Sequence, residues 1–413
     1  SLTNDATKGL KSNLLNIGII VHCYTFHKLG LNIINRYYNE VTIYDNRYLE
    51  YIVNEYFLSI VKYSYRKYYI MVLFKRFNYN DIVNSKEFLI YKKNIVTFIN
   101  LLKNKGLDTD FIYNKYKNSV NKITYKFILE IYRIYENELN SSNSIDLNDM
   151  IIKAEKLVNK YHLKLKYKYI IIDEFQDSSK IRLNLIRSII KYNNAKIMCV
   201  GDDYQSIYRF AGSDIEIFLK FKDYFVDSKI MYLKNTYRNS KELLYVSNKF
   251  ICKNKYQFKK ELFSNKSNSK PIKIYYSSNL IYGLKKLISI VKNNYMIIGR
   301  NNNDIKYYVD KFCDVNSINY YTAHKSKGLE SDNVILINLC DDIMGFPSKI
   351  KNNKIIKSLF DKELYKYDEE RRLFYVALTR TKNSVFMLID KNNMSVFVKE
   401  VIRDYKNYIE FIQ

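Results

Sequence analysis

The chain is poor in several residue types: it has no tryptophan, two prolines, ten glycines and five cysteines among 413 residues. Its cysteines form no CxxC pair, so the sequence predicts reduced thiols in a cytoplasmic compartment and no metal site built on cysteine. They are Cys23, Cys199, Cys252, Cys313 and Cys340. Uncharged apolar runs of about 18 residues are also absent, and the start of the chain is polar, so neither a membrane span nor a cleavable signal is expected.

What the chain has in excess is positive charge. Lysine and arginine number 68 against 42 acidic residues, which gives a formal net charge of +26. Such a surplus favours a polyanionic partner through counterion release. The alternative is compositional drift, because lysine, asparagine, isoleucine and tyrosine are all frequent, as in a protein from an AT-rich genome. Charge alone therefore suggests nucleic acid without proving it.

The length predicts two or three domains, and hydrophobic periodicity predicts a mixed α/β fold. We expect a helix over residues 1–16, a short buried strand over Ile17–Tyr24, and helices throughout residues 36–140, which contain almost no glycine or proline. Asp146–Met150 is typical of a helix start, and that helix should run to about residue 161.

Two apolar runs, Tyr169–Ile172 and Lys196–Val200, flank a helical pattern over residues 179–192. This spacing predicts a parallel strand–helix–strand unit. The first run ends in the adjacent carboxylates Asp173 and Glu174. Paired acids at the end of a buried strand suit a hydrated Mg²⁺ and a phosphate chain, although a polar strand end without function is the alternative.

The second half of the chain has the same alternating character. Strands are expected at Lys229–Leu233, Ile272–Tyr276, Tyr295–Gly299, Tyr320–Thr322, Val334–Asn338 and Ser384–Ile389. Helical patterns lie between them, so this half is also expected to be α/β.

Motifs in a fixed order identify a family. The segments are TNDATKGLKSNL (3–14), TFHKLG (25–30), DEFQD (173–177), GDDYQSIYRFAGS (201–213), NTYRNS (235–240), TAHKSKGLESD (322–332) and EERRLFYVALTRTK (369–382). Together they resemble the superfamily-1 helicases of the UvrD/Rep family, and nearly the whole chain is covered. RFAGS (209–213), IIGRNNND (297–304) and GFPS (345–348) are most similar to the DNA helicase IV branch.

The resemblance implies two RecA-like P-loop NTPase domains, with a helical insertion in the first and no large accessory insertion in the second. Residues 1–35 and 141–228 would form the first domain, residues 36–140 the helical subdomain, and residues 229–413 the second domain. The implied protein is a cytoplasmic, ATP-dependent 3'-5' DNA helicase or translocase that is a monomer or weak oligomer. Its partners would be single-stranded or 3'-tailed duplex DNA, and its cofactors ATP and Mg²⁺.

The resemblance also implies roles at the ATP site. Asp173 would hold Mg²⁺ through water, Glu174 would position the attacking water, and Gln205 would sense the γ-phosphate. Arg238 and Arg380 would act as arginine fingers, because a guanidinium matches phosphate geometry. Three further residues would bind the nucleotide: Tyr237, Gly328 and Glu330. Tyr237 would stack on the adenine, and Glu330 would accept a hydrogen bond from the ribose hydroxyl.

On the DNA side, Tyr208 and Phe210 would offer aromatic faces to unstacked bases. Four other positions resemble family residues near the DNA backbone: Asn4, Thr25, His27 and Thr322. His324 and Lys325 resemble the residues that link the nucleotide and DNA sites. A core aromatic is the alternative for Phe210, and a satisfied core histidine is the alternative for His27.

One departure from the family is large. No segment reads GxxxxGK[ST], so the loop that cradles ATP phosphates is not in the sequence. The first expectation is therefore a fragment of a helicase, inactive as an ATPase on its own. The alternative is a complete relic that binds nucleic acid or RNA polymerase without hydrolysing ATP. A partner nuclease has no support, because no acidic cluster follows Lys382.

Overall fold

The computed structural model describes residues 4–412 except residues 39, 61–63, 118, 120, 292–293, 311–318, 351–352 and 361–364, and it describes no side chains at residues 4–6, 64, 111, 115 and 116. Cys313 and the side chain of Asn4 therefore lie outside the described residues. Contacts divide the chain into two units, which we treat separately. Unit 1 contains residues 1–201, 208–218 and 352–361, and unit 2 contains residues 202–207, 219–351 and 362–413.

Unit 1 consists mainly of helices. They are α1 (Asn4–Asn16), α2 (Phe26–Ile34), α3 (Asn46–Ile60), α4 (Ser64–Phe74), α5 (Tyr79–Val83), α6 (Lys86–Asn104), α7 (Thr109–Tyr116), α8 (Lys122–Ser141), α9 (Leu147–Tyr161), α10 (Lys180–Asn193), α11 (Ile215–Leu219) and α16 (Lys354–Lys357). Four short strands complete it: β1 (Thr42–Tyr44), β2 (Ser144–Asp146), β3 (Tyr169–Ile172) and β4 (Lys196–Cys199). The strands form two parallel pairs, β1 with β2 and β3 with β4.

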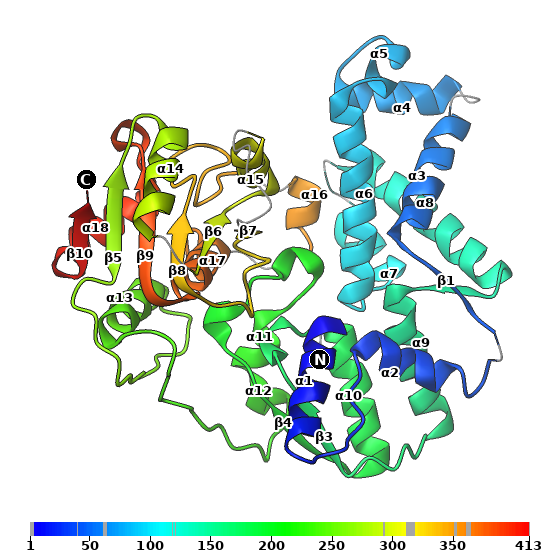
Figure 1. The fold of residues 1–413 in the computed structure, drawn as a ribbon. Coiled ribbons are helices and arrows are strands. Elements are labelled where there is room, and N and C mark those ends of the chain that lie inside the picture. The colour runs from blue at the N-terminus through cyan, green and yellow to red at the C-terminus, as the bar shows by residue number, and fades with distance from the viewer. Residues whose placement is uncertain are drawn as a thin grey trace. The chain divides into compact units, whose positions relative to one another are not determined.

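Within unit 1, α3, α6 and α8 enclose a large apolar core (Figure 1). In this core the ring of Phe57 meets those of Phe88 and Phe127 edge to face, with ring centroids 5.2 Å and 5.9 Å apart. Such pairs add stabilisation beyond the area that they bury. The predicted run of helices over residues 36–140 is confirmed, apart from the short strand β1.

A buried ionic cluster fixes α6 against α9. Lys103 Nζ lies 2.7 Å from Glu136 Oε1, 2.7 Å from Asp146 Oδ2 and 2.8 Å from Asp149 Oδ1, and the lysine side chain is buried. Asp146 also caps α9, because its side chain accepts from Asp149 N in a capping box. The predicted helix start at Asp146 is confirmed.

The strand–helix–strand unit β3–α10–β4 is confirmed, with Tyr169 in register with Lys196. The predicted burial of β3 is wrong for two residues, because Tyr169 and Ile171 are 70% and 69% exposed. The strand predicted over residues 17–24 is also wrong. That segment forms no ladder, and Ile17 and Ile20 are exposed.

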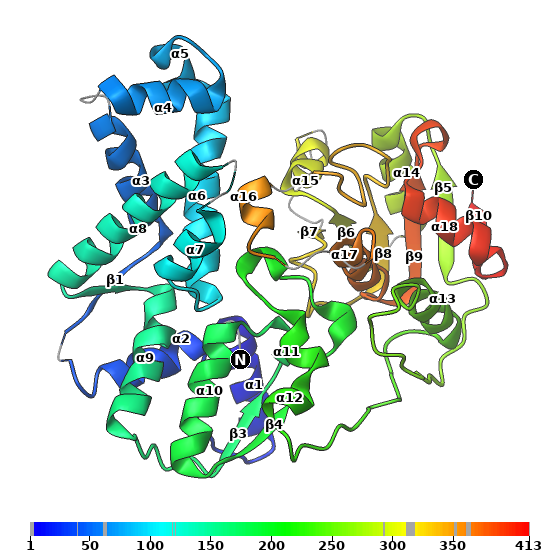
Figure 2. The ribbon, with the colours of Figure 1, turned by 180° about the vertical axis from the view of Figure 1, so that it is seen from behind.

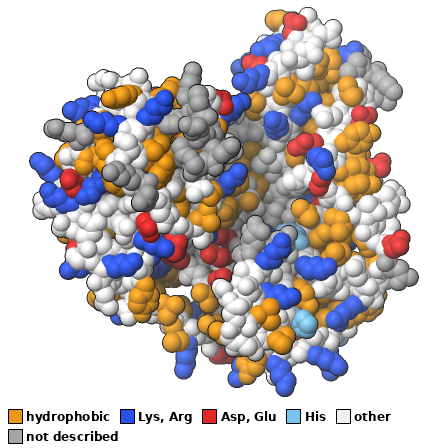
Figure 3. Space-filling model, viewed as in Figure 1, with side chains coloured by type: hydrophobic (Ala, Val, Ile, Leu, Met, Phe, Trp, Pro, Cys, Tyr) orange, Lys and Arg blue, Asp and Glu red, His pale blue; other side chains and the backbone are white. Residues whose placement is uncertain are grey.

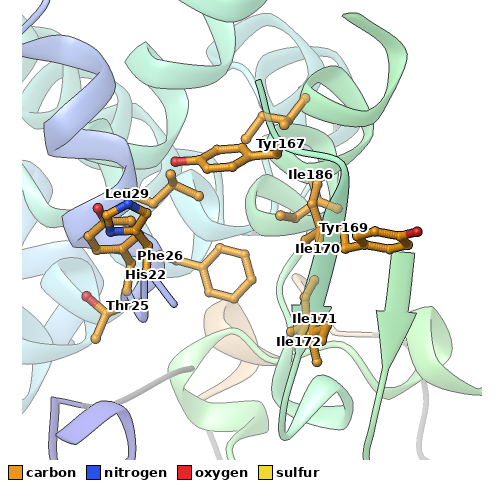
Figure 4. Close-up of a pocket in the computed structure, with 12 residues that line it drawn as sticks. His22, Thr25, Phe26, Leu29, Tyr167, Tyr169, Ile170, Ile171, Ile172 and Ile186 are labelled. Atoms are coloured by element: carbon orange, nitrogen blue, oxygen red, sulfur yellow. The ribbon is translucent and has the colours of Figure 1, made fainter. Parts of the chain in front are cut away.

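The segment over residues 17–24 borders a cavity of about 140 Å³ (Figure 4). His22, Phe26 and Leu29 lie on one side of it and Ile170–Ile172 of β3 on the other. The lining contains no carboxylate and no lysine or arginine. The cavity therefore offers a ligand apolar and neutral polar side chains but no charged one.

Unit 2 is built on one six-stranded parallel sheet in the order β10-β5-β9-β8-β6-β7. Its strands are β5 (Ile272–Tyr276), β6 (Tyr295–Gly299), β7 (Asn319–Thr322), β8 (Ser331–Leu336), β9 (Thr381–Ile389) and β10 (Ile409–Ile412). Its helices are α12 (Phe221–Tyr224), α13 (Lys241–Ile251), α14 (Leu280–Val291), α15 (Asn302–Val309), α17 (Asp368–Leu378) and α18 (Val396–Asp404). Five of the six strands were predicted, and β10 was missed.

Helices cover both faces of this sheet (Figures 1 and 2). On one face, Leu284 and Leu287 of α14 pack with Tyr308 of α15. On the other, Phe374 of α17 lies 5.2 Å from Phe250 of α13 between ring centroids. Parallel sheets are normally buried on both faces in this way, so the mixed α/β prediction is confirmed.

The predicted strand Lys229–Leu233 is wrong. It forms no ladder, and Met231 and Leu233 are 90% and 89% exposed. An apolar run forms a strand only where a neighbour takes up its backbone groups, and no described residue pairs with this one. By contacts, residues 202–207 and 219–228 group with unit 2 and residues 352–361 with unit 1. The predicted domain limits stay a prediction.

None of the described helices is long and apolar enough to cross a membrane. Lysine and arginine side chains lie on both units over the face drawn in Figure 3, without gathering in one dominant patch on that face. Charge on this face therefore does not by itself select a binding surface.

Candidate functional site

Two carboxylates lie where β3 ends. Asp173 and Glu174 are both half-buried, and Glu174 N donates to Asp173 Oδ1 at 2.9 Å. Glu174 has a φ of +54°, a conformation that is unfavourable for a residue with a side chain. Strained backbone of this kind is common at functional sites, where the surrounding structure maintains it.

The neighbouring strand supplies that surrounding structure. Phe175 N donates to Val200 O at 2.9 Å, and Val200 N donates to Ile172 O at 2.8 Å, so β4 holds the turn after β3 on both sides. Gly201 is needed at the end of β4, because a Cβ there would lie 2.4 Å from Gln176 Oε1. The side chain of Gln176 in turn donates to Glu174 Oε2. These contacts orient the Glu174 carboxylate.

Of the other predicted residues of unit 1, Asn4 begins α1, and the rest lie on a turn and at the start of α2. Tyr208 and Phe210 form an edge-to-face pair with ring centroids 6.0 Å apart, and Phe210 is 57% exposed. The exposed ring excludes the alternative in which Phe210 is a core aromatic. Thr25 is buried and caps α2, because its Oγ1 accepts from Lys28 N at 3.2 Å.

His27 lies on the first turn of α2, and its surroundings determine its charge. Burial and the nearby Arg182 lower its pKa to about 4, while Asp146 opposes the shift. The imidazole is therefore neutral at pH 7 and could contact a phosphate only as a neutral hydrogen-bond donor. A role of His27 near the DNA backbone stays a prediction.

In unit 2, Gln205 is held at both ends of its amide. Its Nε2 donates to Asp202 Oδ2 at 2.7 Å, and its Oε1 accepts from the Arg380 guanidinium at 3.3 Å. Arg380 itself is buried and donates from Nε to Val376 O at 2.9 Å. Burial would raise the pKa of Asp202, but the charge of Lys260 together with hydrogen bonds from Lys260, Gln205 and Tyr204 lowers it. The glutamine thus lies between an ionised carboxylate and a buried cation.

A second cation cluster surrounds Glu330. Arg238 Nε lies 2.9 Å from Glu330 Oε2, and Lys382 Nζ lies 3.1 Å from Glu330 Oε1. Hydrogen bonds from Lys382 and Arg238 lower the pKa of Glu330, which stays ionised. Tyr237 is 79% exposed, with room for a ring to stack on it, and Gly328 has a φ of +83°. The structure therefore brings Arg238 and Glu330 into direct contact.

The segment after β7 meets the Gln205 segment. Burial and Arg300 lower the pKa of His324 to about 4, and a hydrogen bond with the backbone of Ile207 opposes that shift. Thr322 is buried, and its Oγ1 accepts from Lys325 N at 3.2 Å. The Lys325 side chain is exposed. Within unit 2, His324 is thus in contact with the segment that carries Gln205.

Three residues that hold the Gln205 segment were missed by sequence reasoning. Lys260 pairs with Asp202 at 2.5 Å and also with Asp203. Lys327 Nζ donates to Gln205 O at 2.9 Å, and Arg372 Nε donates to Ser206 O at 2.6 Å. Lys327 and Arg372 lie inside recognised motifs, so the sequence could have indicated their roles. Lys260 is one of 68 basic residues, and nothing in the sequence distinguishes it from the others.

The chain's residues fit Mg²⁺ and ATP in part. Asp173 is a half-buried carboxylate at a strand end, which suits a magnesium ion that keeps most of its water. Among the described residues, no group of three or more His, Cys, Asp or Glu could hold a metal by itself. Phosphate oxygens and water would have to complete the coordination, as is usual for magnesium bound with a nucleotide.

Family comparison matches both parts of the chain. Residues 1–226 match the UvrD/REP helicase N-terminal domain, and residues 301–392 match the UvrD-like helicase C-terminal domain. The first match alone covers more than half of the 413 residues.

Individual relatives agree. DNA helicase IV of Escherichia coli (strain K12) is 31% identical over 282 residues, which is 66% of this chain and 41% of the relative. The ATP-dependent DNA helicase Rep of Buchnera aphidicola subsp. Baizongia pistaciae is 30% identical over 281 residues, 64% of this chain and 37% of the relative. The chain thus matches about two fifths of each.

Among solved structures, the C-terminal domain of a possible DNA helicase from Lactobacillus plantarum WCFS1 is 13% identical. It aligns with 43% of this chain and 99% of that chain at a TM-score of 0.28. This score is too low to support an argument from shape.

Proposed function

Because the chain belongs to the UvrD/Rep helicase family, we propose that it carries most of the machinery of an ATP-dependent 3'-5' DNA helicase or translocase. Its substrate would be single-stranded DNA or a 3'-tailed duplex. The observation that carries the proposal is the fixed amide of Gln205, held between Asp202 and the buried Arg380. A guanidinium stays positively charged, and its planar set of donors suits the geometry of a phosphate.

The chemistry would be phosphoryl transfer to water, with bound Mg²⁺ neutralising charge on the phosphates. Asp173 would hold that ion through water. Glu174 would orient the attacking water and accept its proton. The hydrogen bond from Gln176 orients the Glu174 carboxylate for this role. Gln205 and Arg380 would respond to the γ-phosphate from unit 2.

Arg238 and Glu330 would have coupled roles in nucleotide binding. Arg238 would act as the arginine finger, and Glu330 would accept a hydrogen bond from the ribose. The two side chains form an ion pair at 2.9 Å. Nucleotide binding would therefore exchange this pair for contacts with phosphate and ribose, while Lys382 keeps Glu330 ionised. Tyr237 would stack on the adenine near Gly328.

DNA contacts would come from both units. Tyr208 and Phe210 would stack on unstacked bases, which requires no particular sequence. The remaining candidates for backbone contacts, or for linking the two sites, are Asn4, Thr25, His27, Thr322, His324 and Lys325.

A second candidate is a protein that binds nucleic acid or RNA polymerase without hydrolysing ATP. The observation that favours it is the lack of a GxxxxGK[ST] segment in the 413 residues. Against it stands the joint presence of Asp173, Glu174, Gln205, Arg238 and Arg380, since a module that only binds has no need for all five.

The first test uses the 413-residue chain itself. It should bind fluorescein-labelled oligo-dT, with an affinity that falls steeply as salt rises, because basic residues displace counterions from the phosphates. It should not hydrolyse ATP, because no loop cradles the phosphates. Failure to bind oligo-dT at any salt would contradict the proposed function, and metal-dependent hydrolysis would contradict the need for that loop.

A further inference from the structure

One short helix of unit 1 comes from the C-terminal half of the sequence. Residues 352–361, which include α16, group with unit 1, although the residues on either side group with unit 2. Ile355 and Leu359 are buried in the core formed by α3, α6 and α8, and Tyr125 Oη donates to Ser358 Oγ at 3.1 Å. A helix of four residues is not stable alone, so packing holds it in place.

Phe360, which follows α16, lies near two cations. The guanidinium carbon of Arg209 is 4.8 Å from the centre of its ring, and Lys105 Nζ is 5.6 Å from it. Both distances are within the roughly 6 Å at which a cation is attracted to an aromatic face. Lys105 ends α6, and Arg209 lies between Tyr208 and Phe210.

The turn that carries this aromatic pair is also held from other sides. Gly212 has a φ of +91°, and a Cβ there would lie 2.7 Å from the Cβ of Asn104, so the turn approaches the end of α6 closely. Ser213 Oγ donates to Asp177 O at 2.9 Å, and Asp214 N donates to Ser178 O at 2.9 Å. Phe360 adds a contact from a segment more than 140 positions later in the sequence.

We propose that Phe360 positions Tyr208 and Phe210 for stacking on single-stranded DNA by holding Arg209. The ring of Phe360 is half-buried and is not itself assigned to DNA. A guanidinium held over a ring loses rotational freedom, and the two residues beside Arg209 lose freedom with it. The inference rests on the proposed function, in which DNA bases stack on Tyr208 and Phe210.

The test measures oligo-dT binding by the 413-residue chain at fixed salt. Phe360→Leu keeps an apolar side chain against α6 but removes the aromatic face, and it should weaken binding by about twofold to tenfold. Its melting temperature should fall by no more than a few degrees, because this contact contributes little to overall stability. Phe360→Tyr keeps the ring and should bind like the parent chain. Phe77→Leu is the matched control, because Phe77 is 97% exposed and lies outside the Phe360 cluster.

A double variant separates positioning from a general effect. Combined with Phe210→Ala, Phe360→Leu should cause a smaller loss than it causes alone, because one of the two stacking faces on which it acts is already gone. Parent-level binding by Phe360→Leu overturns the inference, and so does an undiminished loss in the Phe210→Ala background. Equal melting-temperature losses in Phe360→Leu and Phe360→Tyr would also overturn it. A parent chain that does not bind oligo-dT would instead contradict the proposed function.

Discussion

The sheets of the two units differ in how much of their apolar surface is covered. In unit 2, β6, β8 and β9 each have a strand on both sides and helices over both faces. In unit 1, β3 and β4 are paired only with each other among the described residues, and Ile171 of β3 remains largely exposed. Similar apolar runs therefore form a buried or an exposed strand according to their neighbours.

Some of the candidate site residues also differ in burial between the two units. Asp173 and Glu174 of unit 1 lie half-buried on a two-stranded scaffold, and Phe210 is exposed. Arg380 of unit 2 is buried beside a six-stranded sheet. Asp173, Glu174 and Phe210 are thus accessible to solvent, whereas Arg380 is packed, although Tyr237 and Lys325 of unit 2 are exposed as well.

The largest effect on this comparison should come from the core of unit 2. Phe374 is buried, and its ring centroid lies 5.1–5.5 Å from those of Phe346, Phe250 and Phe397. Phe374→Ala should lower the free energy of unfolding by about 3–5 kcal/mol through lost burial and a cavity. Ile171→Ala, at an exposed strand position, should change it by less than about 0.5 kcal/mol. Urea denaturation followed by circular dichroism measures both, and equal losses would show that β3 is covered in solution.

A smaller effect is expected at the exposed aromatic pair of unit 1. Phe210→Ala should weaken oligo-dT binding by about 1–3 kcal/mol with little change in its salt dependence, because stacking releases no counterions. Lys325→Gln should instead reduce the slope of log affinity against log salt by about one if it contacts a phosphate. Fluorescence anisotropy over a salt series distinguishes the two effects. A changed slope for Phe210→Ala would contradict the stacking role.

The smallest effect compares one histidine from each unit. Burial lowers the pKa of His27 and of His324 to about 4, below the ordinary value of 6.5. Between these values the unfolded chain binds more protons, so each histidine makes the protein less stable as the pH falls from 6.5 to 4. Replacing either one with glutamine should reduce that pH-dependent loss by about 1–2 kcal/mol. Urea denaturation at pH 7 and pH 5 tests this, and an unchanged pH dependence in both variants would contradict it.

Helix caps and apolar runs predicted much of the fold, because each depends only on residues that are close in the sequence. The helix start at Asp146 and five strands of unit 2 were predicted from capping residues and apolar runs. The segments 17–24 and 229–233 have the same apolar character but no strand to pair with among the described residues. Sequence periodicity describes the run itself and contains no information on its neighbours.

The site divides in the same way. Motifs located Asp173, Glu174, Gln205 and Arg380, because those residues occur at fixed spacings. They did not indicate Lys260 or Phe360, whose partners Asp202 and Arg209 lie 58 and 151 positions earlier. Contacts over such separations depend on the folded chain, and one sequence without relatives cannot reveal them.

In the proposed function, Glu174 activates water for ATP hydrolysis. The direct test of this role is a fusion protein in which a GxxxxGK[ST] segment from a family member precedes Ser1, with hydrolysis measured with and without oligo-dT. The fusion should hydrolyse ATP and be stimulated by DNA. Glu174→Gln should lower the rate by at least about 100-fold and leave ATP binding nearly intact, because the lost group acts on water. Glu50→Gln, at an exposed position, is the control and should change neither quantity. Near-normal turnover in the Glu174→Gln fusion would contradict the account.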